Sequence, residues 1–151
     1  MDRLTLELVP VRHGDHVVTE IGILINGRSL EVLAREVELP HASAEGKPKL
    51  AGDYSPLTLS DVRADRAHFL GTPIASWFED GDTVLMGCPC GEWGCWPLTA
   101  RVEVSETTVA WAGFRNGHRD WDLSELGAFT FDRVQYEDAL AVFPEQGLGD
   151  G

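Results

Sequence analysis

Residues 17–32, VVTEIGILINGRSLEV, contain the pattern that decides the fold. Apolar and polar side chains alternate on both sides of Asn26-Gly27, which is typical of strands with one buried face. Asn-Gly is a preferred pair for a two-residue hairpin turn, because both positions need a positive φ. The pattern therefore predicts a hairpin with one buried face. We expect that face to consist of Ile21, Ile23, Leu30 and Val32.

The same alternation predicts strands before and after this hairpin. Residues 4–8 alternate and lead, through a turn at 13–15, into the run that starts at Val17. Residues 83–86 are typical of a short strand. Residues 98–104 and 109–113 predict a second half-buried hairpin, which turns near Glu106-Thr107.

Helices are expected midway and at the end of the chain. Ser60 can cap a helix that runs to Leu70, and a single helical turn should follow Thr72-Pro73. Residues 40–56 are rich in Pro, Gly, Ala and Ser and predict a long loop. Asp132 and Gln135 have the spacing of a capping box, which predicts a final helix. Its buried stripe should comprise Tyr136, Ala139, Leu140 and Phe143.

These elements predict an α+β fold. We expect a mostly antiparallel sheet built from hairpins, with short helices inserted midway and one C-terminal helix. The chain has 151 residues, which suits one domain. We place this domain at residues 1–146 and expect a flexible tail at residues 147–151.

Charge excludes some classes of partner. The sequence has 12 Lys and Arg against 25 Asp and Glu, a formal net charge of −13. That charge repels nucleic-acid phosphates and anionic lipid, so we expect binding to neither nucleic acid nor membranes. The sequence shows no membrane span and no signal peptide, and we expect a cytoplasmic protein.

The most distinctive chemistry lies at residues 88–95, CPCGEWGC. Three cysteines within eight residues do not resemble a secreted disulfide framework, and in a reducing compartment they indicate metal or redox chemistry. Cys88, Cys90 and Cys95 could supply three of the four ligands of a structural zinc site. His118 is the first candidate for the fourth ligand and His68 the second.

Other interpretations of the cysteines stay open. The thiols could simply pack beside Trp93 and Trp96. Cys90 and Cys95 could form a redox pair, or one cysteine could be a nucleophile with His118 as its base.

Residues 115–122 combine arginine, histidine and tryptophan. Arg and Trp are enriched at recognition sites, so Arg115, Arg119 and Trp121 are candidate recognition residues. The same residues could instead form a structural corner held by arginine–carboxylate pairs.

Residues 88–98, CPCGEWGCWPL, resemble a motif C-x-C-G-x-x-G-C-W-P-L of an uncharacterised bacterial protein family, which is frequent in actinobacteria. The resemblance continues through residues 111–115, 118–119, 121–124 and 131–136, and upstream through 26–28, 38–40, 50–54 and 68–71. It implies a shared site at the cysteines but no activity. The family often has proline before the histidine that corresponds to His118, where this chain has Gly117.

These observations favour a small, acidic, non-enzymatic protein. We expect it to carry a structural zinc knuckle and to act by recognising a protein or a small ligand. A role in bacterial immunity or defence is compatible with its size and acidity. The alternative is a thiol-dependent enzyme or redox sensor that uses Cys90 or Cys95 with His118.

Overall fold

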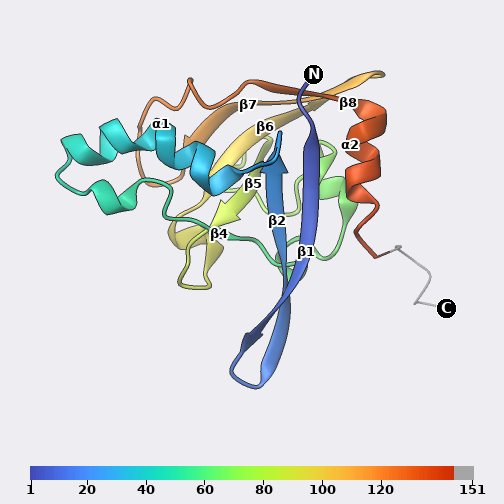
Figure 1. The fold of residues 1–151 in the computed structure, drawn as a ribbon, viewed down its shortest axis with the longest axis horizontal. Coiled ribbons are helices and arrows are strands. Elements are labelled where there is room, and N and C mark those ends of the chain that lie inside the picture. The colour runs from blue at the N-terminus through green and yellow to red at the C-terminus, as the bar shows by residue number, and fades with distance from the viewer. Residues whose placement is uncertain (145–151) are drawn as a thin grey trace.

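The computed structural model describes residues 1–144 (Figure 1). The predicted tail at 147–151 lies outside these residues. The strands are β1 (Leu4–His13), β2 (His16–Ile25), β3 (Arg28–Ser29), β4 (Ser55–Pro56), β5 (Asp82–Gly87), β6 (Leu98–Val104), β7 (Thr108–Asn116) and β8 (Phe129–Asp132). The helices are α1 (Leu30–Ala44) and α2 (Arg133–Leu140), and short 3-10 turns lie at Pro48–Leu50, Ser60–Val62, Arg66–Phe69 and Trp93–Cys95.

The strands form two antiparallel sheets, one of order β1-β2-β3 and one of order β4-β5-β6-β7-β8. Hydrogen bonds join the sheets at both edges. Ile21 N–H donates to Leu57 O at 2.7 Å, directly after the end of β4, and Asp2 N–H donates to Thr130 O at 2.9 Å in β8. With these two links, the strands of both sheets surround one core in a closed order. The two helices lie on opposite sides of the strands, as Figure 1 shows. This architecture confirms the predicted α+β class with hairpins and a C-terminal helix.

The hairpin of β1 and β2 confirms the alternation at residues 4–8 and 17–25. Leu6 pairs with Ile23 and Leu8 with Ile21 across a turn at Gly14-Asp15. Leu6, Ile21 and Ile23 are buried. Toward its tip the hairpin extends beyond the body of the molecule (Figure 1), where its side chains become more exposed.

The prediction of a long strand after Asn26-Gly27 is wrong. The turn forms, with φ of 54° at Asn26 and 82° at Gly27, and Ile25 pairs with Arg28. Pairing then stops after two residues, because Ser29 caps α1 and its side chain accepts from Val32 N–H at 3.3 Å. Leu30 is fully buried, but Val32 lies on the outer face of the helix and is 46% exposed. The buried stripe of this segment has helical period and comprises Leu30, Ala34, Glu38 and Ala42.

The middle of the chain differs from prediction in two further respects. Helix α1 continues through Pro40 to Ala44, so residues 40–44 do not belong to a loop. The predicted helix from Ser60 to Leu70 is two short 3-10 turns, because Arg63 and Ala64 adopt positive φ between them. The turn expected at Thr72-Pro73 does not form a helix.

The larger sheet confirms the predicted strands around residues 83–86, 98–104 and 109–113 and adds β8, which the sequence did not indicate. Asp132 caps α2 by accepting from Gln135 N–H at 3.1 Å, as predicted. The helix ends at Leu140, and Ala139 is only partly buried. Within residues 1–144, no helix combines the length and the apolar character needed to cross a membrane.

Candidate metal centre

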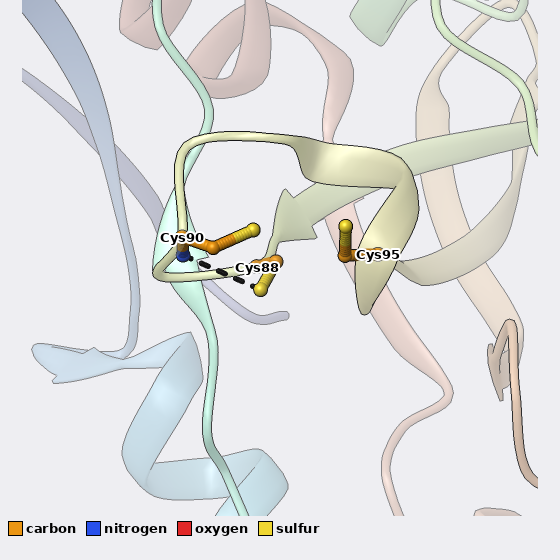
Figure 2. A group of neighbouring side chains, drawn as sticks. All are labelled: Cys88, Cys90 and Cys95. Atoms are coloured by element: carbon orange, nitrogen blue, oxygen red, sulfur yellow. Dashed lines mark hydrogen bonds between the residues drawn. The ribbon is translucent and has the colours of Figure 1, made fainter.

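The cysteine loop, residues 88–95, begins where β5 ends and leads into β6 (Figure 2). The loop folds back tightly on β5. A Cβ atom added at Gly87 would lie 2.4 Å from Trp93 Cβ, so only glycine permits this approach. Gly91 has a φ of 98°, which also favours glycine. The Cys95 N–H donates to Glu92 O at 3.0 Å and closes the 3-10 turn that presents Cys95.

The loop brings the three thiols together. The Sγ atoms of Cys88, Cys90 and Cys95 all lie within 4.8 Å of one another. Figure 2 shows the Cys90 and Cys95 side chains pointing into the space that the loop encloses, with Cys88 at the base of the loop. Cys88 is half-buried, whereas Cys90 and Cys95 are exposed. A spacing of this size allows all three sulfur atoms to contact one ion, since zinc–sulfur bonds are about 2.3 Å long.

Backbone amides point at two of the sulfurs. Cys90 N–H donates to Cys88 Sγ at 3.3 Å, and Glu92 N–H donates to Cys90 Sγ at 3.4 Å. Such bonds stabilise negative charge on sulfur, which is the form that binds metal. The glycine after Cys90 allows the turn that aims the second amide.

The three thiols also differ in their readiness to ionise. The hydrogen bond from Cys88, followed by the Glu92 amide, lowers the pKa of Cys90. The pKa of Cys88 and that of Cys95 are raised, in both cases first by the hydrogen bond that each makes with Cys90. Cys90 is therefore the first of the three to become a thiolate.

His118, the first candidate for a fourth ligand, lies beside the loop and braces it. Its Nε2 contacts Gly94 O at 2.9 Å, and because a carbonyl only accepts, Nε2 carries the proton. The ring stacks on Trp96 with an angle of 9° between the planes and contacts Trp77 with 4.9 Å between ring centroids. Within residues 1–144, the group of clustered ligand atoms contains only the three cysteines.

His68, the second candidate, is fully buried in the core. Its Nε2 donates to Val84 O at 2.7 Å, and its Nδ1 accepts from Ile74 N–H at 3.1 Å. Burial lowers the pKa of His68 to about 4. Both ring nitrogens are occupied, so His68 holds the loop before β5 in place and has no lone pair for a metal.

The predicted recognition residues lie around one hollow next to the cysteine loop. Arg115, Arg119 and Trp121 line a space of about 670 Å³, together with Phe78 and His118. A second hollow of about 640 Å³ continues from Arg115 and Trp121 along β7. Volumes of this size are typical of ligand sites.

The arginines are also paired with carboxylates, as the structural-corner interpretation expected. Arg115 bonds to Asp80 at 3.0 Å and lies over the Phe78 ring, 3.8 Å from its centroid. Arg119 bonds to Glu45 at 3.0 Å. Hydrogen bonds lower the pKa of Glu45, first the bond from Trp121 and then the bond from Arg119. These pairs hold the side chains in place around the hollow.

A buried hydrogen-bond chain that the sequence did not indicate reaches the same hollow. Fully buried Glu38 accepts from Gly52 N–H at 2.8 Å and from the Tyr54 hydroxyl. The Asn116 amide donates to Tyr54 Oη at 3.0 Å and accepts from His118 N–H at 2.8 Å.

This chain joins α1 to the loop that contains His118. Burial raises the pKa of Glu38 despite the hydrogen bonds that it accepts. Glu38 lies four residues from both Ala34 and Ala42, and this i, i+4 spacing could have identified it as a buried residue. The spacing has meaning only if the segment is recognised as a helix.

The arrangement can hold one metal ion on three thiolates, beside a hollow lined by arginine and aromatic side chains. Comparisons with protein-family models, with curated proteins and with solved structures find no match to this chain.

Proposed function

We propose that this protein binds one zinc ion at Cys88, Cys90 and Cys95 and acts by recognising a protein or a small ligand. The observation that carries the proposal is the convergence of three Sγ atoms within 4.8 Å, with backbone amides directed at two of them. Soft thiolate ligands select zinc among the common divalent ions. The ion would tie the loop after β5 to the turn before β6.

Recognition would take place in the hollow around Arg115, Arg119 and Trp121. His118 contacts Gly94 in the cysteine loop and also lines this hollow, so a metal ion bound in the loop would support one side of the recognition site through His118. Within residues 1–144, Arg115 uses one nitrogen for Asp80 and keeps its other donors free for a ligand. These features support a binding role that needs no catalytic group.

The test is zinc content and its effect on stability. We expect about one zinc per chain by elemental analysis. We expect a chelator to remove about 2.7 kcal/mol of stability compared with free zinc at a hundred times its Kd. Cys88→Ser and Cys90→Ser should lose the zinc and become insensitive to the chelator.

Glu92→Gln is the matched control, because it changes a loop side chain that lies outside the sulfur cluster. It should bind zinc as the wild-type protein does. A wild-type protein without zinc, whose stability no chelator changes, would contradict the proposal.

One observation favours a second function, a thiol-dependent enzyme or redox sensor. Cys90 is exposed and its pKa is lowered, the properties of a reactive cysteine. His118, its suggested base, is bonded to the Gly94 carbonyl and to no sulfur in residues 1–144. Rapid alkylation of Cys90 in a metal-free wild-type protein, with the rate unchanged in His118→Gln, would favour a redox sensor without a histidine base.

A further inference from the structure

The geometry points to an open coordination site: we propose that the metal at the cysteine loop keeps its fourth position for a small thiol compound from solution. This inference rests on the proposed zinc site and goes beyond it, because it changes a structural knuckle into a ligand-binding centre. Closed structural zinc sites have four protein ligands, whereas sites that bind other molecules keep one position open.

Within residues 1–144, the cysteine loop supplies three metal ligands and not four. The cluster holds three sulfur atoms and no histidine, aspartate or glutamate. Cys90 and Cys95 are exposed, so the side of the ion away from the half-buried Cys88 faces solvent. A water molecule would occupy that position until a stronger ligand replaced it.

Hydrogen bonds and ring contacts hold His118 beside the sulfur cluster and outside it. Its Nε2–H donates to Gly94 O, and its backbone N–H donates to Asn116 Oδ1 at 2.8 Å. Trp77 and Trp96 pack on the ring, and Trp77 Nε1 donates to Gly117 O at 3.0 Å in the adjoining residue. Neither ring nitrogen of His118 belongs to the cluster of ligand atoms, so the ring would have to move off Trp77 and Trp96 to bind the ion, whereas an external ligand requires no such movement.

Gly117 is part of this clamp. A Cβ atom at residue 117 would lie 2.5 Å from Pro97 Cγ and 2.7 Å from Trp77 Nε1. Glycine thus allows the chain to pass beside Pro97 and Trp77, and that path directs the His118 ring onto Trp96.

Charge around the site restricts the class of ligand. Glu92 lies in the loop between Cys90 and Cys95, and the sequence has a formal net charge of −13, so the surroundings repel carboxylates and phosphates. A thiol is neutral in solution at pH 7 and becomes a soft thiolate ligand when it binds metal. It would displace the bound water and release its proton to solvent. Four thiolates form one of the common ligand sets of zinc.

Cobalt(II) in place of zinc tests this directly, because its visible and near-ultraviolet absorption reports the number and type of ligands. The full-length protein is loaded with cobalt and titrated with 2-mercaptoethanol. We expect a saturable gain of charge-transfer absorption, corresponding to one additional thiolate. His118→Gln should give the same starting spectrum and the same gain, and so should His13→Ala, the control for the histidine that lines a small hollow with Cys88.

The outcomes separate the two proposals. A cobalt spectrum that does not respond to the thiol, and that changes in His118→Gln, would show a closed site and overturn this inference while leaving metal binding intact. A response to imidazole but not to the thiol would overturn the ligand class. Failure of the wild-type protein to bind either cobalt or zinc would overturn the proposed function itself.

Discussion

Two regions of this protein contain clustered polar and aromatic groups, and they satisfy those groups differently. In the core, fully buried Trp111 donates to Tyr136 Oη at 3.0 Å, and Tyr136 donates to Phe69 O at 2.6 Å. The Trp111 indole and the Tyr136 hydroxyl thus both have their partners within the fold. In the cysteine loop two sulfurs accept from backbone amides, and all three sulfurs lie within 4.8 Å of one another. The core pair is satisfied within the fold, whereas the three thiols of the loop lie close enough together to hold a metal ion.

The largest expected effect comes from the core. Trp111→Ala should reduce the free energy of unfolding by about 3–5 kcal/mol, because it removes a fully buried indole and the hydrogen bond that Tyr136 Oη accepts from it. Urea unfolding with and without zinc measures the change. Since the core does not depend on the ion, we expect the same loss in both conditions. A loss that disappears when zinc is removed would show that the two regions are not independent.

The second prediction tests whether His68 is a neutral core histidine and not a metal ligand. Its folded pKa is about 4 and its ordinary value 6.5, so the unfolded chain takes up a proton first as the pH falls. The contribution of His68 is complete above about pH 6.5 and is lost toward pH 4, a change of about 3 kcal/mol.

Urea unfolding of the wild type and of His68→Gln across this range isolates that contribution, because Gln can still donate to Val84 O. The difference between them should shrink as the pH falls. A constant difference would mean that His68 is not neutral in the folded protein.

The smallest effect is expected at Asp82, which connects the two regions. Its carboxylate accepts from Ser76 Oγ at 2.5 Å and from Trp77 N–H at 3.0 Å, and thus positions the Trp77 ring that packs on His118. Burial alone would raise the pKa of Asp82, but these hydrogen bonds outweigh it and keep the pKa below its ordinary value.

Asp82→Asn should therefore cost about 2 kcal/mol at pH 7, the range for hydrogen bonds to a charged group. The wild type should lose this contribution as the pH falls through and below 3.8, the ordinary pKa of Asp. Asp80→Asn, which changes an exposed partner of Arg115, is the control and should cost less than about 1 kcal/mol. Equal losses in the two variants would show that the Asp82 bonds have no special role.

Several parts of this structure could be predicted because they depend on neighbours in the chain. The hairpins of β1–β2 and β6–β7 follow from alternation, and Asp132 caps α2 through a residue three positions away. The cysteines are close in space because they are close in sequence. The error after Asn26-Gly27 has the same origin: the turn is local and correct, but residues 30–32 fit a strand and a helix equally well over so short a stretch.

The sequence by itself determined the α+β class, the main hairpins and the cluster of three cysteines, since turn chemistry, alternation and short spacing act over a few residues. Tertiary structure alone decided the place of His118, the burial of His68 and the chain from Glu38 through Tyr54 to Asn116. Those outcomes depend on segments far apart in sequence, such as Tyr54 and Asn116, which are 62 residues apart. Only packing around a shared core brings such side chains together and determines which nitrogen of a histidine is free.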